Sequence, residues 1–161
     1  MMKIRNTTEA DQEDLWQMLK PVFRAGDTYA IDPAIDRGDA LAYWTGADAG
    51  SFVIEVDGRL LGTYYIKTNA QGGGAHVCNC GFITAPNSGG QGIARKMLED
   101  ALTRAKAVGY KAMQFNFVLA NNVRAIDIWH RAGFETVGRL PHAFDHPKDG
   151  MIDALVMFKT L

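Results

Sequence analysis

A glycine-rich joint between an apolar segment and a long amphipathic segment constrains this chain more than any other feature. The joint reads Pro86-Asn87-Ser88-Gly89-Gly90-Gln91-Gly92-Ile93-Ala94-Arg95-Lys96. Residues 75–84 before it are rich in strand formers, and residues 92–110 after it have apolar side chains at helical spacing. The first N–H groups of a helix lack intrahelical partners and its N-terminal end is electropositive, so glycines there let an anion approach the backbone. The joint therefore predicts either a phosphate-binding loop or an ordinary strand-to-helix turn.

Two common kinds of phosphate loop do not match this joint. A Walker loop needs Gly-Lys-Ser/Thr, whereas Gly92 is followed by Ile93 and Ala94. A dinucleotide fingerprint needs Gly-x-Gly-x-x-Gly within an early βαβ unit, and the segment from Gly90 to Arg95 fits that pattern poorly. A nucleoside triphosphatase loop is thus excluded, and a dinucleotide site is disfavoured.

Composition excludes further classes of function. The chain has 161 residues, 47% of them hydrophobic, which suits a single domain spanning residues 1–161. The formal net charge is −1, and Lys and Arg are scattered rather than gathered in a stripe, so we expect no nucleic-acid partner. No apolar run approaches the ~20 residues of a membrane span, so we expect no membrane partner and a cytoplasmic location.

The two cysteines, Cys78 and Cys80, lie two residues apart in the predicted strand, so both side chains point to one face. A disulfide across that spacing would strain an extended backbone. No further Cys or His accompanies them at zinc-like spacing. We therefore expect two buried, reduced thiols and no metal.

Periodicity predicts a mixed order of elements along the rest of the chain. Thr8 and Asp11 begin a helix that Pro21 is expected to kink or shorten, and a loop over residues 24–35 leads to a second helix around Trp44. The predicted strands start at Ile4 and cover residues 51–56, 60–68, 75–84, 112–118, 134–140 and 151–159, and the later helices cover residues 92–110 and 121–132. A polar loop with His142, Asp145 and His146 is expected between the last two strands.

The joint and this order of elements together resemble the GNAT-type N-acetyltransferase superfamily. Its pyrophosphate loop reads Gln/Arg-x-x-Gly-x-Gly/Ala; Gly92 and Ala94 fill the last two places, and Gly89 stands where Gln or Arg is usual. A second motif, Asn122-x-x-Ala125-x-x-x-Trp129-x-x-x-Gly133-Phe134, is similar to the family's Asn-x-x-Ala-x-x-x-Tyr-x-x-x-Gly-Phe. The resemblance implies an α/β fold with a mixed sheet, splayed between its fourth and fifth strands and flanked by about four helices.

The resemblance also implies that acetyl-CoA is the cosubstrate. The main chain of the loop would hold the pyrophosphate and the end of the fourth strand would bond the pantetheine amides. The implied cofactor-binding residues are Phe82, Ile83, Thr84, Gly89, Gly90, Gln91, Gly92, Ile93, Ala94, Arg95, Asn122 and Trp129. Many relatives have a tyrosine acid where this chain has Trp129, and some have a glutamate base in the strand that here contains Asn79. Asn79 and Asn116 are therefore the candidate catalytic residues, as amides that position an amine.

A narrower similarity is to acetyltransferases that act on azetidine-2-carboxylate and related secondary amines. It implies a small amino- or imino-acid-like acceptor, with Thr28, Tyr29 and His142 as substrate-binding residues. The alternatives are a noncatalytic acyl-CoA-binding regulatory module and a protein or peptide N-acetyltransferase. The edges of the C-terminal strands offer a route to a homodimer.

Overall fold

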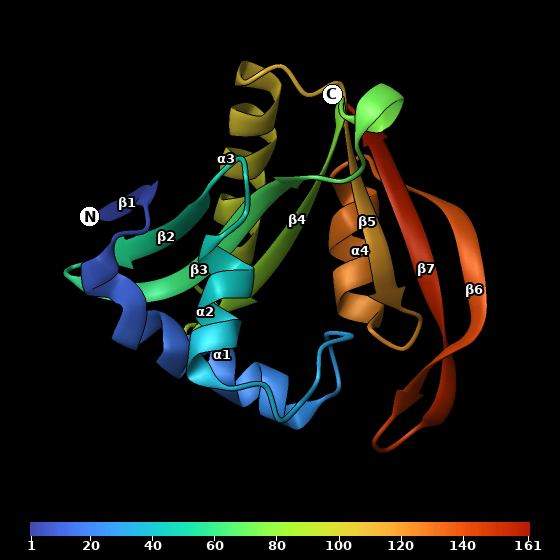
Figure 1. Ribbon diagram of the computed structural model, residues 1–161, viewed down its shortest axis with the longest axis horizontal. Helices are drawn as coiled ribbons and strands as arrows, with labels where there is room; N and C mark the ends of the chain where they lie inside the picture. The colour runs from blue at the N-terminus through green and yellow to red at the C-terminus, as the bar shows by residue number, and fades with distance from the viewer.

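The computed structural model describes residues 1–161 and contains a seven-stranded mixed sheet in the order β1-β2-β3-β4-β5-β7-β6 (Figure 1). Only β4 and β5 run parallel; every other neighbouring pair is antiparallel. The strands are β1 (Met2–Asn6), β2 (Ser51–Val56), β3 (Arg59–Thr68), β4 (Val77–Thr84), β5 (Ala112–Leu119), β6 (Glu135–His146) and β7 (Gly150–Thr160), and the helices are α1 (Gln12–Ala25), α2 (Arg37–Thr45), α3 (Ile93–Ala107) and α4 (Val123–Arg131). The mixed sheet with four helices is the predicted fold.

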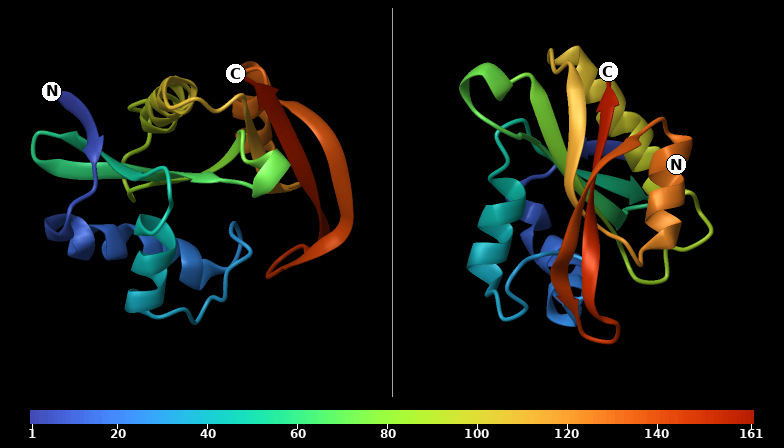
Figure 2. Two further views of the ribbon diagram at one scale, coloured as in Figure 1. Left: turned by 45° about the horizontal axis from the view of Figure 1, so that its top comes forward. Right: turned by 90° about the vertical axis from the view of Figure 1, so that its right-hand side faces the viewer.

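Helices cover both faces of the sheet. Helices α1 and α2 pack on one face and α3 lies on the other, as the left-hand view of Figure 2 shows. Two apolar clusters fill these layers: one combines α1 and α2 with Val53, Tyr65 and Ile83, and the larger one combines α3 with β2 to β5 and β7. The alternation of side chains along each strand divides the apolar residues between the two layers. None of the four helices combines the length and apolarity needed to span a membrane.

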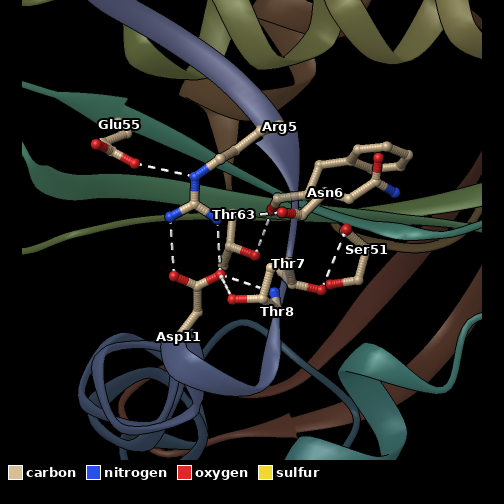
Figure 3. A network of polar contacts seen from close by, with 9 residues as sticks. Arg5, Asn6, Thr7, Thr8, Asp11, Ser51, Glu55 and Thr63 are labelled. Carbon is tan, nitrogen blue, oxygen red and sulfur yellow. Dashed lines mark hydrogen bonds and ion pairs between the residues drawn. The ribbon is translucent and has the colours of Figure 1, made fainter.

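A buried carboxylate fixes the start of α1 against β1 and β2 (Figure 3). The guanidinium of Arg5 donates to both oxygens of Asp11 at 2.8 and 2.9 Å and to Glu55 at 3.0 Å. The N–H of Thr8 donates to the same Asp11 carboxylate at 2.7 Å. These bonds, the Arg5 pair above all, lower the pKa of Asp11. The predicted helix start is confirmed, with a short 3₁₀ turn, Glu9–Asp11, ahead of α1.

The sheet divides between β4 and β5, as predicted. These strands pair only at Val77 with Ala112 and at Cys78 with Met113. Beyond those pairs the two strands diverge towards their C-terminal ends (Figure 1). We call the resulting space, between residues 79–84 of β4 and residues 114–119 of β5, the wedge. Cys78 and Cys80 beside it are buried free thiols, as expected.

The last two strands differ from the prediction. Residues 141–146, expected in a polar loop, belong to strand β6, so His142 and Asp145 lie in a hairpin that turns only at residues 147–149. The register of β6 against β7 shifts between Leu140 and Phe144. An edge strand tolerates such a bulge, and Pro141 inside it, because one side of its backbone needs no partner.

Three element boundaries also required correction. Helix α1 continues through Pro21 to Ala25, so Pro21 does not shorten it. Pro21 has no N–H to donate to the carbonyl of Gln17, and both residues face solvent. Strand β4 begins at Val77 rather than at residue 75, because Ala75 caps the 3₁₀ turn Gly72–Gly74 in a helical conformation and donates its N–H to Gly72. Helix α3 ends at Ala107 rather than at residue 110, where Gly109 follows in a left-handed conformation.

Candidate active site

A cavity of about 300 Å³ occupies the wedge and extends to the α1–α2 connection. Its walls come from the α1–α2 connection, α2, the middle strands of the sheet and α4. The predicted site residues that line it are Thr28, Tyr29, Asn79, Phe82, Asn116, Asn122 and Trp129. The structure thus brings together predicted side chains from segments as far apart in the sequence as Thr28 and Trp129.

The main chain of β4 faces this cavity through alternate residues. Phe82 donates its N–H to the Tyr29 hydroxyl at 2.9 Å and accepts from that hydroxyl through its C=O, also at 2.9 Å. Because main-chain groups alternate in direction along a strand, Cys80 and Thr84 present theirs to the same side. By the same alternation, the main-chain groups of Ile83 are directed to β3 rather than to the wedge, and its side chain is buried in the smaller core cluster.

Tyr29 is held in this position by aromatic packing. Its ring lies edge-on to Phe23 and Trp44, with centroids 5.9 and 6.1 Å away. Burial raises the pKa of Tyr29 well above its ordinary value, although the bond to Phe82 opposes that effect. The hydroxyl is therefore a neutral hydrogen-bond donor and acceptor at physiological pH.

Asn79 spans the narrow end of the wedge. Its Nδ2 donates to the main-chain oxygen of Gln114 at 2.9 Å, and its Oδ1 accepts from the Tyr65 hydroxyl at 3.3 Å. The residue is only 7% exposed. Since a buried amide is costly without partners, these bonds explain how an asparagine is accommodated inside this strand.

Asn116 lies at an irregularity in β5 and is exposed. The register of β5 against β7 shifts between Phe115 and Val118, so the segment around Asn116 bulges away from regular pairing. Its Oδ1 accepts from Gln114 Nε2 at 2.8 Å, and its Nδ2 donates to Asn69 Oδ1 at 2.7 Å. Asn116 is therefore the member of a chain of three amides that lines the cavity.

Helix α4 contributes Asn122 and Trp129. Asn122 is the N-cap of α4 and its side chain accepts from the N–H of Ala125 at 3.3 Å, in agreement with a helix predicted to start at Asn121 or Asn122. Trp129 packs on Phe115 and Phe82, with ring centroids 4.7 and 5.5 Å away. An indole N–H does not act as an acid at neutral pH, so Trp129 supplies an apolar wall.

Sequence reasoning missed the residues of the opposite wall, among them Tyr43, Tyr65, Lys67 and Cys80. The Tyr65 ring lies across Gly81, where any side chain would meet it, since a Cβ there would stand 2.4 Å from the ring. Burial, the largest influence, raises the pKa of Cys80 well above its ordinary value, so its thiol remains protonated. Among the residues that line the cavity there is no Asp, Glu or His.

The glycine-rich joint lies beyond the end of β4 and leads into α3. None of the main-chain N–H groups of residues 89–95 donates a hydrogen bond within the protein; the first to do so is Lys96, to Gly92. Gly90 and Gly92 have φ values of 78° and 69°, which favour glycine, and no atom stands within 4 Å of a Cβ built on either. The loop therefore presents a row of free donors at a helix N-terminus, where an anion is favoured.

The side chains of this joint have separate roles. Ile93 is 2% exposed and anchors the start of α3 in the larger core cluster. Arg95 is exposed and pairs with Glu99 at 3.0 Å along the helix. Arg95 belongs to the first turn of α3, and its guanidinium is directed along the helix to Glu99.

The histidines of β6 do not reach the cavity. His142 is exposed, has a φ of 51°, and donates its main-chain N–H to Asp153 at 2.9 Å. His146 Nδ1 accepts from the main-chain N–H groups of Lys148 and Asp149, which closes the β6–β7 turn. The structure therefore does not bring His142 to the other predicted substrate-binding residues.

Comparison with known proteins agrees with this geometry. Residues 13–134 match the sequence model of the acetyltransferase (GNAT) family. The N-acetyltransferase aca1 of Schizosaccharomyces pombe is 30% identical over 148 residues, which cover 81% of this chain and 71% of that protein. A GCN5-related N-acetyltransferase from Kribbella flavida superposes with a TM-score of 0.94 at 31% identity, covering 99% of this chain and 98% of the other.

The fold alone is shared more widely. The structure of yncA from Salmonella typhimurium, solved with its cofactor acetyl-CoA, superposes with a TM-score of 0.86 at 20% identity and covers 100% of this chain and 94% of the other. The splayed sheet, the free donors of the joint and the family match all agree. The chain belongs to the GNAT family of acetyltransferases and is an acyltransferase.

Proposed function

We propose that this protein moves an acetyl group from acetyl-CoA to the amine of a small amino- or imino-acid-like acceptor. The observation that carries the proposal is the cavity in the wedge, about 300 Å³ in volume and bordered by Asn79 and Asn116. A cavity of that size suits a small molecule. The Tyr29 side chain crosses it to reach Phe82, which favours a compact acceptor over an extended peptide.

The residues present fit acetyl-CoA. The free N–H groups of residues 89–95 match a pyrophosphate, which needs several donors and no protein acceptor. The main-chain groups of Cys80, Phe82 and Thr84 on the wedge side of β4 match the pantetheine amides, which pair with a strand as another strand does, once the Tyr29 hydroxyl leaves Phe82. When bound, acetyl-CoA supplies an acetyl group as a thioester that a neutral amine attacks directly.

The cavity side chains favour direct attack over a covalent acyl-enzyme. Cys80 is the only thiol that lines the cavity, and its raised pKa keeps it protonated and weakly nucleophilic. With no carboxylate or imidazole on the walls, the amine proton would leave to water as the C–N bond forms. The C–S bond of the thioester would break, and the CoA thiolate would leave and take up a proton from water. The amides of Asn79 and Asn116 hold the acceptor at a fixed angle, and such positioning lowers the barrier without proton transfer.

The test is a thiol-release assay with acetyl-CoA and a panel of small amino and imino acids, including azetidine-2-carboxylate. The parent is expected to release thiol with at least one of them. Asn116→Ala should lower kcat/KM by about 10- to 100-fold through lost positioning, with little loss of stability because Asn116 is exposed. Asn6→Ala, at an exposed asparagine of β1 outside the cavity, is the matched control and should act like the parent.

Three outcomes count against the proposal. Thermal stabilisation by acetyl-CoA without thiol release on any amine would favour a binding module. Release with peptides but with no small acceptor would favour a peptide acetyltransferase. Equal activity of the parent, Asn79→Ala and Asn116→Ala would remove the amides from the site.

A further inference from the structure

The cavity contains one charged side chain, Lys67 of β3. No Asp, Glu, His or Arg lines the cavity beside it. No carboxylate lies within 4.0 Å of its Nζ, and its ammonium donates no hydrogen bond to any protein atom. Lys67 is thus a half-buried cation whose hydrogen-bonding capacity the protein leaves unused.

Two tyrosine rings fix the position of this ammonium. Its Nζ lies 5.0 Å from the ring centroid of Tyr43 and 5.3 Å from that of Tyr65. The two rings themselves meet edge-on, 5.9 Å apart. Ring faces attract a cation but accept none of its hydrogen bonds strongly, so the three N–H donors remain available to a ligand. The two rings thus hold a positive charge at the wall of the cavity.

The ammonium also has a defined place relative to the candidate catalytic amides. Lys67 stands directly opposite Asn79 in the pairing of β3 with β4. Residues directly opposite in an antiparallel pair share a face, with Cβ atoms about 4.5 to 5.5 Å apart. Tyr65 contacts both side chains: its ring centroid lies 5.3 Å from the Lys67 Nζ, and its hydroxyl donates to Asn79 Oδ1 at 3.3 Å. An anion on Lys67 is therefore held on the face of the sheet that also carries Asn79. In an α-amino or α-imino acid, one carbon separates the carboxylate from the amine, so a carboxylate on Lys67 keeps the amine on this face of the cavity.

We propose that Lys67 binds the carboxylate of the acceptor, so that the site selects a small amine with a carboxylate on the adjacent carbon. The proposal rests on the acceptor chemistry proposed above and names its substrate class. The carboxylate neutralises a cation that otherwise lacks a partner, and its ion pair with Lys67 directs the amine towards Asn79. An amine of the same size without a carboxylate cannot form that ion pair.

The test compares an acceptor that has a carboxylate with the same compound in which a neutral carboxamide replaces the carboxylate. Kinetics of thiol release are measured with azetidine-2-carboxylate, or with whichever acid of the panel is fastest, and with the corresponding carboxamide. The parent should favour the acid by at least about tenfold in kcat/KM. Lys67→Met, which keeps the length of the side chain, should raise KM for the acid by about 10- to 100-fold, leave the carboxamide unchanged and bring the ratio of the two near one. Lys67→Arg should restore part of the preference.

Lys20→Met is the matched control. Lys20 also lies over an aromatic ring, 5.8 Å from the centroid of Trp16, but it is on the exposed surface of α1 outside the cavity. This variant should keep the parent's preference for the acid. An equal loss on the acid and the carboxamide in Lys67→Met would mean that Lys67 only supports the tyrosines, and would overturn the proposal.

A binding measurement separates this proposal from the proposed function. Calorimetry with the N-acetylated acid and the N-acetylated carboxamide requires no turnover. Tighter binding of the acid by the parent, lost in Lys67→Met but not in Lys20→Met, would support the carboxylate site even if the thiol-release assay found no activity. Equal binding of the acid and the carboxamide by the parent would refute it, even if the protein acetylates other amines.

Discussion

Removal of the Tyr29 hydroxyl tests how the wedge accepts its donor substrate. In Tyr29→Phe, the N–H and C=O of Phe82 both lose a partner at 2.9 Å. The phenyl ring keeps its contacts with Phe23 and Trp44, because the hydroxyl is the only group removed. The substitution therefore isolates the two hydrogen bonds from the aromatic packing.

The expected magnitude follows from those two bonds. A hydrogen bond within a protein contributes about 0.5 to 1.5 kcal/mol net, so the loss of two lowers the free energy of unfolding by about 1 to 3 kcal/mol. Phe82 is half-buried and borders the cavity, so water replaces part of the loss and the lower end applies. For a chain of this size the melting temperature should fall by roughly 2 to 4 °C for each kcal/mol.

Affinity for acetyl-CoA should change in the opposite direction. In the parent, a ligand that pairs with the main chain of Phe82 must first displace the Tyr29 hydroxyl from it. In Tyr29→Phe there is no hydroxyl to displace. The same contribution of about 1 kcal/mol then favours binding to Tyr29→Phe, which lowers Kd by about fivefold. Calorimetric titration with acetyl-CoA, beside melting curves with and without it, measures both effects.

Tyr110→Phe provides the control for this experiment. Its hydroxyl pairs with that of Thr68 at 2.7 Å outside the cavity, so the variant should lose stability without any change in Kd for acetyl-CoA. A Kd that rises or stays constant in Tyr29→Phe would show that the hydroxyl remains on Phe82 when the ligand binds. The reasoning about the open side of β4 would then be wrong.

Two further predictions concern the phosphate loop and the acid stability of the fold. Gly92→Ala should lower stability by about 1 to 2 kcal/mol because of its φ of 69°, and should raise KM for acetyl-CoA. Gly150→Ala, with a φ of 71° and equally open space, should lose similar stability with KM unchanged; equal KM values in both variants would exclude the loop from binding. Asp11→Asn should lower the free energy of unfolding at pH 7 by about 2 to 3 kcal/mol, because it removes charged hydrogen bonds to Arg5. The pKa of Asp11 is lowered in the folded state, so its contribution to stability is present above the unfolded pKa and is lost progressively as the pH falls below about 4. Urea unfolding should therefore show the stabilities of the parent and Asp11→Asn converging below that pH. A constant difference between them down to pH 2 would contradict this.

The parts of the molecule that were predictable from the sequence are those determined by neighbouring residues. The N-cap role of Asn122 and the free donors around Gly92 follow from local rules of helix ends, and the structure shows both. The Asp57-Gly58 turn has positive φ at both positions, as the two-residue hairpin required. Each of these features involves only a few consecutive residues.

Features that depend on distant strands were not predictable in the same way. Alternation along β3 places Tyr65 and Lys67 on one face, but it does not say which helix or loop covers that face. Their place in the site follows only from the pairing with Gly81 and Asn79 of β4 and from the position of Tyr43 on α2. In the same way, the length of β6 depends on its pairing with β7, because Pro141 and the polar residues near it suggest a loop when read alone.

The loop before α3 and the side chains around the cavity should respond differently to substitution. The loop that presents free N–H groups at α3 lies on one continuous segment, and its donors are main-chain atoms that most side-chain substitutions leave in place. The proposed acceptor side is assembled from Tyr29, Tyr43, Lys67 and Asn116, which belong to separate elements of the chain. Substitution at any one of them alters the cavity while the strand pairing and the joint persist. We therefore expect acceptor preference to respond to single substitutions on the α1–α2 connection and β3 that leave Kd for acetyl-CoA unchanged, with Tyr29 as the exception because its hydroxyl contacts β4 itself.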